Sequence, residues 1–320
     1  MKKNIRTSVF FEKQQFFARF LVKNYRITIF FCNFAGQMQL SIKVHNRLLE
    51  LSSPKVMAIV NITPDSFYTS FGKQDSNELL NHIEELIVQG ADILDIGACS
   101  TRPNSTPVDA QEEWRRLEPV LRAIRTHFPQ VIISVDTFRA KIAEQAILAG
   151  ADIINDVYGG DADKQMWEVI AQYRVPYVLT YSLEVATKGE VKDYDYTMSC
   201  ALDFFQSRLD ALHRMGVTDV IIDPGFGFAK TQQQNYTILH NLDILAALNV
   251  PILAGISRKS MLYIPLGVAP ADVLPATIAA NTIGLERGAN ILRVHDVVAA
   301  KQAITIYSLT HKDVRICSLG

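Results

Sequence analysis

Residues 56–61 read VMAIVN, a run of five apolar residues that ends in a polar one. The same pattern of apolar run, polar loop and helical stretch recurs along the chain. Seven further runs lie at residues 92–96, 131–135, 152–154, 177–180, 220–222, 252–256 and 291–294. Their nearly continuous apolar character is typical of parallel strands that are covered on both faces. Eight such units favour closure into a (β/α)8 TIM barrel over the alternative, a doubly wound open α/β sheet.

Helical stretches separate these runs. Residues 76–89 place apolar side chains at helical spacing and are followed by Gly90, and residues 139–149 are followed by Gly150. Glycine ends helices because it enters the left-handed backbone region without a steric penalty. The chain is therefore predicted to form one α/β domain.

The first 37 residues differ in composition from the rest. They hold eight of the 16 phenylalanines, and they carry seven Lys or Arg residues against one acid, Glu12. We interpret residues 1–37 as an N-terminal extension, poorly ordered or a leader; a targeting peptide or a membrane-surface helix is the alternative. From Met38 to Leu51 apolar residues alternate with polar ones, which predicts a strand or hairpin that closes the bottom of a barrel domain at residues 38–320.

Composition excludes several classes of protein. The whole chain carries a net charge of −1 and the extension carries +6, so the remaining residues carry −7 and have no electrostatic reason to bind nucleic acid. No stretch reaches the roughly 18 uninterrupted apolar residues of a membrane span. Four widely separated cysteines without CxxC spacing predict reduced thiols and a cytoplasmic protein.

Polar residues follow most of the apolar runs. The set comprises Asn61, Asp136, Asn155, Asp223, Lys259, Ser260, Arg293 and His295. Each one alone has a structural explanation, because Asp and Asn cap helices and an isolated His is usually structural. In a (β/α)8 barrel, however, the carboxyl ends of all strands converge on one rim, where active sites are built. We therefore expect these side chains to form one site.

Four of these residues suit a polar heterocycle. Asp136, Asn155 and Asp223 match a flat ring with adjacent N–H donors, because ionised carboxylates only accept hydrogen bonds. Lys259 would meet a carbonyl or ring acceptor of the same ligand.

The other four suit anions. Arg293 and His295 lie two positions apart on a strand and share a face, so that with Asn61 they form a clamp for an oxyanion or diphosphate. Ser260, at the start of a helix, offers backbone N–H groups to a second anion such as a carboxylate. The site is thus predicted to take a heterocycle, a diphosphate and a small acid.

Six motifs occur along residues 40–310 in a fixed order. They are NITPDSF at 61–67, STRP at 100–103, SVDT at 134–137, DPGFGF at 223–228, SRKS at 257–260 and RVHD at 293–296. Each is weak alone, but together they resemble the signature of the dihydropteroate synthase family, which has a pterin-binding barrel. The resemblance implies a homodimeric transferase of folate biosynthesis that joins 6-hydroxymethyl-7,8-dihydropterin diphosphate to p-aminobenzoate and releases diphosphate.

The resemblance also implies a role for each matching residue. The pterin pocket would comprise Asp136, Asn155, Asp223 and Lys259. The diphosphate site would comprise Asn61, Arg293 and His295, with Mg²⁺ at Asn61 as the cofactor. The p-aminobenzoate site would comprise Thr101, Arg102, Pro103, Phe228 and Ser260. Of these residues, Asp136, Lys259 and Arg293 are expected to be catalytic.

The chain departs from the family pattern after its fifth run. LTYSL at residues 179–183 stands where a Met-His-Met run is usual, so a small polar residue replaces the methionine that packs on the pterin. Either the ring of Tyr181 substitutes for that methionine, or the pocket is looser. ACS at 98–100 also replaces the usual Gly-Glu-Ser, and the first loop lacks Ser-Asp-Gly-Gly.

Two rival functions follow from the same fold. A methyltetrahydrofolate-dependent methyltransferase shares the pterin-binding barrel but would not need the SRKS and RVHD anion elements. A non-catalytic relative would bind pterin without turnover, and the departure after the fifth run motivates that reading.

Overall fold

The computed structural model describes residues 40–45, 47–62, 73–99, 108–182 and 194–311. The predicted extension at residues 1–37 lies outside the described residues, as do Thr101, Arg102 and Pro103. None of the described helices is long and apolar enough to cross a membrane.

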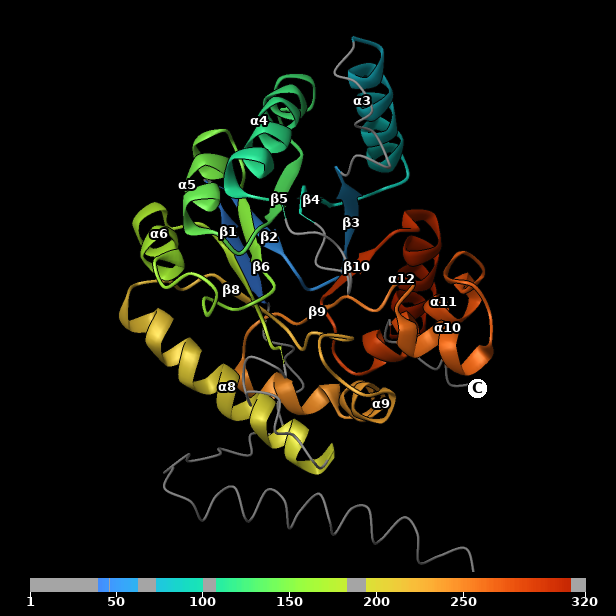
Figure 1. Ribbon diagram of the computed structural model, residues 1–320. Helices are drawn as coiled ribbons and strands as arrows, with labels where there is room; N and C mark the ends of the chain where they lie inside the picture. Colours follow the sequence, from blue (N-terminus) through green and yellow to red (C-terminus); the bar gives the residue numbers. More distant parts are fainter. Residues whose placement is uncertain (1–39, 46, 63–72, 100–107, 183–193, 312–320) are drawn as a thin grey trace, which may run out of the picture. The chain divides into compact units, whose positions relative to one another are not determined.

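Eight parallel strands form one sheet (Figure 1). They are β3 (Lys55–Asn61), β4 (Ile93–Gly97), β5 (Ile132–Asp136), β6 (Ile153–Asp156), β7 (Tyr177–Thr180), β8 (Val220–Asp223), β9 (Leu253–Ala254) and β10 (Ile291–Val294). Strands β3 to β8 pair in sequence order, and β10 pairs with both β9 and β3. A parallel bridge between Ile222 and Ile252 joins β8 to the segment before β9. The sheet therefore closes into the predicted barrel, and the open doubly wound sheet is excluded.

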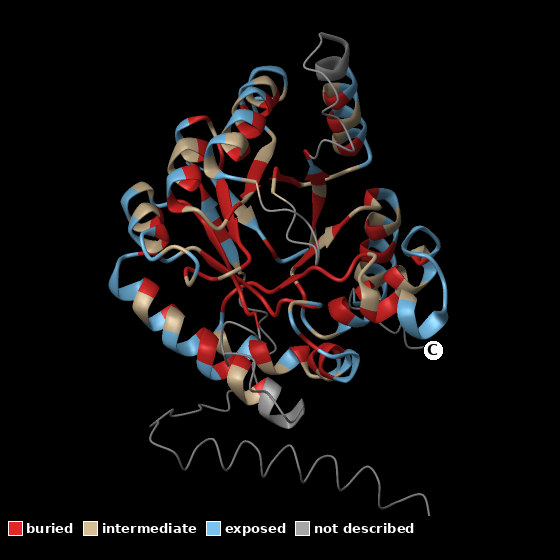
Figure 2. Ribbon diagram, in the orientation of Figure 1, coloured by how far each residue is buried: buried red, intermediate tan, exposed pale blue. Residues whose placement is uncertain are grey.

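Helices connect the strands and cover the outside of the sheet (Figure 1). They are α3 (Lys73–Val88), α4 (Ala110–His127), α5 (Ala140–Leu148), α6 (Met166–Tyr173), α8 (Tyr194–Arg214), α9 (Gln232–His240), α10 (Ser260–Leu266), α11 (Leu274–Glu286) and α12 (Val297–His311), with the 3-10 helices η1 (Leu242–Leu248) and η2 (Pro270–Asp272). Figure 2 shows the strands of the eight-stranded sheet mostly buried, and the surrounding helices with one buried and one exposed face. The glycines that follow α3 and α5, Gly90 and Gly150, have φ of +99° and +105°, as expected for helix stops.

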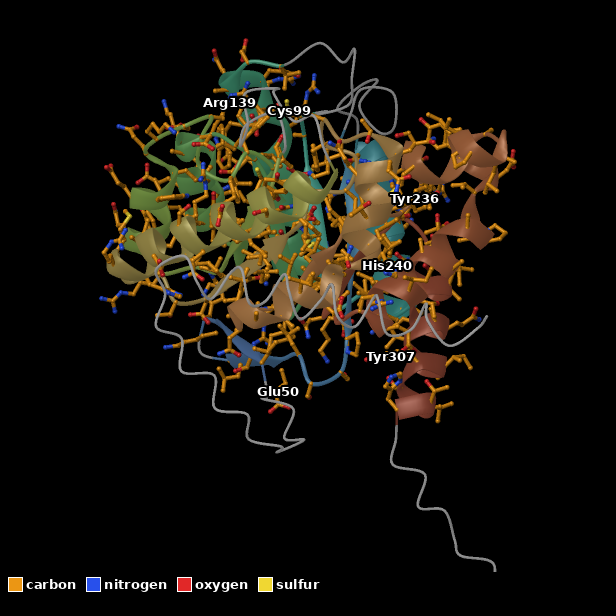
Figure 3. The ribbon with its side chains drawn as sticks, turned by 90° about the horizontal axis from the view of Figure 1, so that it is seen from below. Glu50, Cys99, Arg139, Tyr236, His240 and Tyr307 are labelled. Atoms are coloured by element: carbon orange, nitrogen blue, oxygen red, sulfur yellow. The ribbon has the colours of Figure 1, made fainter. Side chains whose placement is uncertain are left out.

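A hairpin closes the amino-terminal end of the barrel. Its strands, β1 (Ser41–Val44) and β2 (Arg47–Glu50), pair antiparallel. Ile42, Val44 and Leu51 are buried against a layer of inward-facing strand residues. That layer comprises Met57, Ile93, Ile153, Val178, Ile221, Leu253 and Ile291. The hairpin predicted at the bottom of the barrel is confirmed, and Figure 3 shows Glu50 of β2 at the opposite end from Cys99, which follows β4.

The barrel interior changes from apolar to polar along the strands. Side chains alternate along a strand, so the residues two positions beyond the apolar layer also face inward. On β4 the inward positions after Ile93 are Asp95 and Gly97, and on β5 they are Ser134 and Asp136. The carboxyl-terminal rim therefore presents polar side chains above an apolar base.

Candidate functional site

Strand register places the predicted side chains next to one another. Across β3, β4, β5 and β6, the ladder aligns Asn61 with Gly97, Gly97 with Asp136, and Asp136 with Asn155. Across β7 and β8 it aligns Thr180 with Asp223. Asn155 lies within β6 and not after it, but its side chain still belongs to this row.

Arg293 on β10 connects several members of the row. Its Nε donates to Asp95 Oδ2 at 2.6 Å, and its Nη2 donates to Asp136 Oδ2 at 2.8 Å. Asp95 is fully buried and also accepts from Ser134 Oγ at 2.6 Å and from Asn155 Nδ2 at 3.1 Å. One buried carboxylate thus orients side chains from β5, β6 and β10.

The carboxylate partners of Arg293 stabilise its positive charge. Burial alone would lower the pKa of Arg293, but the carboxylates of Asp95 and Asp136 raise it above its ordinary value. Burial raises the pKa of Asp136 to about 7; Arg293 opposes that rise, while other carboxylates of the region add to it. The rim therefore holds a permanent cation beside a carboxyl group that titrates near neutrality.

Asp223 and Lys259 bring a second set of opposite charges to the same rim. Burial raises the pKa of Asp223, whose Oδ1 accepts from Gly225 N at 2.7 Å, and Lys259 opposes that rise. Burial lowers the pKa of Lys259 to about 8, against the attraction of Asp223. Lys259 Nζ donates to the carbonyl of Phe226 and lies 4.6 Å from the centroid of the Phe228 ring.

Gly255 separates the two charged pairs. A Cβ at this position would lie 3.6 Å from Asp223 Oδ2 and 3.9 Å from Arg293 Cβ. The glycine thus leaves room between the carboxylate of β8 and the guanidinium of β10. It also follows β9 directly, so the seventh strand is shorter than the run predicted at residues 252–256.

His295 completes the anion-binding side of the rim. Its Nδ1 lies 3.0 Å from Ser257 Oγ, and its backbone N–H donates to the same oxygen at 3.2 Å. Ser260 begins α10 and is partly exposed. The structure therefore brings together the predicted pterin and diphosphate residues, whereas Thr101, Arg102 and Pro103 lie outside the described residues.

Two residues of this region were not predicted. Asp95 and Lys230 are both buried. Asp95 accepts a hydrogen bond from Arg293, and Lys230 donates one to the carbonyl of Gly225 in the loop after Asp223. A signal for Asp95 was present, since a charged residue within the buried run ILDIG must face the barrel interior. Lys230 had no comparable signal because it lies in a loop.

Tyr181 does not take the place of the missing methionine. Its ring is fully buried and packs against Phe204 and Phe205 of α8, with ring centroids 5.2 and 6.1 Å apart. Thr180 faces the barrel interior, because it lies two positions after the inward-facing Val178 and aligns with Asp223. A short hydroxyl-bearing side chain thus stands at the position where the family resemblance expects a methionine.

Thr180 allows a test of stability. Its buried Oγ1 has no hydrogen-bond partner among the described residues. Replacing Thr180 by valine keeps the shape and removes a buried hydroxyl, so we expect the free energy of unfolding to rise by about 1 kcal/mol and Tm by about 2–4 °C. Calorimetry measures the change. Thr277→Val is the control, because that buried hydroxyl accepts from Arg258 N at 3.3 Å and its loss should lower Tm. A lower Tm for Thr180→Val would show that its hydroxyl is bonded.

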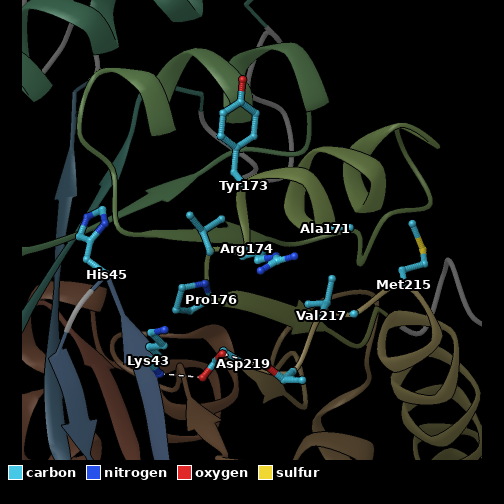
Figure 4. A pocket seen from close by; sticks show the side chains of 12 residues that line it. Lys43, His45, Ala171, Tyr173, Arg174, Pro176, Met215, Val217 and Asp219 are labelled. Carbon is cyan, nitrogen blue, oxygen red and sulfur yellow. Dashed lines mark hydrogen bonds between the residues drawn. The ribbon is translucent and has the colours of Figure 1, made fainter.

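A cavity lies at the other end of the barrel (Figure 4). Its volume is about 600 Å³, and it is lined by the hairpin and by the segments that enter β7 and β8, including Lys43, Arg174 and Asp219. Asp219 Oδ1 accepts from the backbone N–H of Lys43 at 2.6 Å, which ties the hairpin to the barrel. None of the predicted site residues lines this cavity.

Comparison with known proteins points to the same site. A family model described as "Pterin binding enzyme" matches residues 57–295. The dihydropteroate synthase of Clostridium beijerinckii is 38% identical over 251 residues, which are 78% of this chain and 91% of that protein. The dihydropteroate synthase of Bacillus subtilis is 38% identical over 245 residues, 76% of this chain and 83% of that protein.

Solved structures agree with the sequence matches. The structure of Xanthomonas albilineans dihydropteroate synthase with 4-aminobenzoic acid has a TM-score of 0.78 and 36% identity, covering 86% of this chain and 99% of that one. The same enzyme in complex with 7,8-dihydropteroate has a TM-score of 0.74 and 32% identity, covering 85% and 98%. The chain therefore belongs to the dihydropteroate synthase family of pterin-binding barrel enzymes.

Proposed function

We propose that this chain condenses 6-hydroxymethyl-7,8-dihydropterin diphosphate with p-aminobenzoate to give 7,8-dihydropteroate and diphosphate. The observation that carries the proposal is the paired arrangement at one rim. Arg293 bonds to both Asp95 and Asp136, and Asp223 and Lys259 lie close enough to shift each other's pKa. The relatives that share this barrel have been solved with 4-aminobenzoic acid and with 7,8-dihydropteroate.

The pterin takes the carboxylate side of the rim. Asp136 and Asp223 accept from its ring N–H donors, as does the side-chain oxygen of Asn155, whose amide nitrogen already donates to Asp95 at 3.1 Å. Lys259 donates to an acceptor on the same ring. Ionised Asp136 also stabilises positive charge as it develops on the pterin during the reaction.

The diphosphate takes the cationic side. Bonds to Asp95 and Asp136 use two of the five N–H donors of Arg293, and the remaining donors match phosphate oxygens. Asn61 ends β3, the strand that pairs with β10, and His295 directly follows β10. No protein nucleophile is required, because diphosphate leaves as the arylamine attacks.

The bond changes are simple. The nitrogen of p-aminobenzoate forms a bond to the exocyclic methylene carbon of the pterin, the carbon–oxygen bond to diphosphate breaks, and the amine loses a proton. Phe228 supports the arylamine ring and Ser260 lies at its carboxylate, with Thr101, Arg102 and Pro103 completing the subsite. Catalysis then comes from alignment of the two substrates and from stabilisation of the leaving group.

Magnesium fits this site as a partner of the substrate. The described residues contain no group of three or more His, Cys, Asp or Glu side chains that could hold a metal ion. Asn61 supplies one amide oxygen, which would lie 3.7 Å from a Cβ at Gly97, so the glycine leaves space beside it. A single oxygen ligand suits Mg²⁺, which binds mainly to substrate phosphates and water. Bound there, it would neutralise charge on the departing diphosphate.

We also propose a homodimer. Val298, Ile306 and Leu309 share one face of α12 and are exposed by 48, 63 and 53%, and Ile283 on the adjacent α11 is exposed by 46%. A second copy of the chain would cover these side chains. Light scattering should give twice the chain mass for the wild type and the single mass for Ile306→Glu, whereas one mass for both would reject this interface. The cytoplasmic location stays a prediction.

Diphosphate release tests the proposed reaction. The substrate is 6-hydroxymethyl-7,8-dihydropterin diphosphate with Mg²⁺, assayed with and without p-aminobenzoate. Release that requires the arylamine and matches dihydropteroate formation supports the proposal. A folded protein that binds pterin without releasing diphosphate would instead be a non-catalytic relative, and transfer of a methyl group from methyltetrahydrofolate would indicate the methyltransferase.

A further inference from the structure

Lys230 is a buried lysine that pairs with no carboxylate among the described residues. Its side chain lies just beyond the DPGFGF motif and is 8% exposed. Its Nζ donates to the carbonyl oxygens of Tyr181 and Gly225 at 2.8 Å each, and to that of Phe228 at 3.4 Å. No ion pair involves it in the described part of the chain. A buried ammonium is costly to desolvate, so three backbone acceptors at one nitrogen indicate a specific role.

These carbonyls belong to two different loops. Tyr181 follows β7, whereas Gly225 and Phe228 follow β8. The two loops touch at Gly225, where φ is +66° and a Cβ would lie 2.1 Å from the carbonyl oxygen of Tyr181. Lys230 Nζ also lies 4.6 Å from the centroid of the Tyr181 ring, within the range of a cation–π contact. Lys230 thus fastens the end of β7 to the loop after β8.

The fastened loop carries the contacts of Lys259. Lys259 Nζ donates to the Phe226 carbonyl and sits over the Phe228 ring. From the outside, Asn235 of α9 holds the same loop, because its Oδ1 accepts from Gly227 N at 2.7 Å and its Nδ2 donates to Lys230 O at 3.2 Å. A change at Lys230 would therefore move both the pterin-side ammonium and the ring beneath the arylamine.

We propose that Lys230 is a positioning residue for the condensation, because its ammonium fixes the Phe226–Phe228 segment and thereby Lys259 and Phe228. The proposal rests on the proposed function for the roles of Lys259 and Phe228. It also assigns a purpose to Tyr181, whose carbonyl and ring both meet Lys230. The departure of this chain at Tyr181 is thus part of the junction between the two loops and does not supply a wall of the pocket.

The protonation state of Lys230 predicts a pH dependence of kcat/KM. Burial and then the nearby Lys259 lower the pKa of Lys230 to about 7, while Asp223 opposes the change. Within the part of the chain that the structure describes, those two groups and Tyr181 are the titratable groups facing it. Below pH 7 the ammonium makes all its bonds as a charged donor; as pH rises through 7 it becomes an amine and the loop is held less firmly. The alkaline limb of kcat/KM should therefore begin near pH 7.

The test compares Lys230→Met, Lys230→Arg and a control. Methionine keeps the stem and removes the charge, so we expect kcat/KM for p-aminobenzoate to fall about 100-fold, mainly through KM, as for a displacement of about 1 Å. Arginine stays charged, so part of the activity should return and the alkaline limb should move toward pH 8, where Lys259 titrates. The control, Lys301→Met, removes a lysine paired with Asp92 at 2.6 Å and should leave kcat/KM unchanged.

Hydrogen exchange gives a readout that does not need activity. Amides of residues 225–230, including Gly227 and Phe228, should exchange faster in Lys230→Met than in the wild type. If Lys230→Met fails to fold, the wild type should show the same loosening between about pH 6 and pH 8, after correction for intrinsic rates. Unchanged exchange and unchanged kcat/KM would overturn the proposal. If the wild type releases no diphosphate but the Lys230→Met variant still exchanges faster than the wild type, the proposed function is rejected and the role of Lys230 in holding the loop is kept.

Discussion

Replacing Arg293 by alanine is expected to lower kcat/KM for the pterin diphosphate by about 10³-fold, the scale of losing a charged donor at a departing oxyanion. Arg293 is bonded to two carboxylates of the described structure, Asp95 and Asp136. Its loss removes a cation from the leaving group and leaves Asp95 and Asp136 facing each other without a countercharge. Both effects act against the reaction.

Steady-state diphosphate release and inhibition by added diphosphate measure this effect. Arg122→Ala is the matched control, because Arg122 pairs with Glu118 on the exposed side of α4 and should tolerate replacement. Circular dichroism of both variants would establish that they fold. If Arg293→Ala changes neither turnover nor inhibition by diphosphate, the clamp is assigned to the wrong residue.

Asp136→Asn is expected to lower kcat/KM by about 10²- to 10³-fold, because an amide supplies no negative charge to the developing pterin cation. The pH dependence should change as well. Burial raises the pKa of Asp136 to about 7, so the carboxylate form is lost as pH falls through that value. The wild-type kcat/KM should therefore rise with pH up to about 7, where the alkaline limb begins, and the asparagine variant should lack this acidic limb.

The acidic and alkaline limbs of the pH profile of kcat/KM report on two different residues, Asp136 and Lys230. Asp136→Asn removes the acidic limb, whereas Lys230→Arg moves the alkaline one. An acidic limb that survives in Asp136→Asn would falsify the assignment of that limb to Asp136. Pterin affinity, measured by calorimetry at about pH 6 and pH 8, checks the same titration without turnover.

Most of the fold follows from local sequence patterns. Apolar runs of three to five residues separated by helical stretches predict strands and helices in order, and Gly90 and Gly150 mark the helix ends directly. Strand-end residues such as Asp136 and Asp223 are predictable as a site because a barrel brings all carboxyl ends to one rim. The hairpin at β1 and β2 was likewise visible in the alternation of Ile42 and Val44 with polar residues.

What could not be predicted depends on contacts between distant segments. Arg293 and Asp95 are 198 positions apart in the chain, and no local pattern pairs them. The direction of the Tyr181 ring depends on the register between β7 and β8, which hydrophobic patterning alone leaves open. Lys230 acts through backbone carbonyls, and a sequence does not reveal which carbonyls a loop will present.

The hairpin at the bottom of the barrel has a practical consequence for handling the protein. It turns Leu48 and Glu50 to the solvent at the end away from the rim, and Leu48 is 66% exposed. A bead, electrode or fluorescent label attached at Glu50 would face away from the catalytic rim, leaving that rim open to the bulk solution. The two ends of the barrel can therefore be engineered separately, one for immobilisation and one for chemistry.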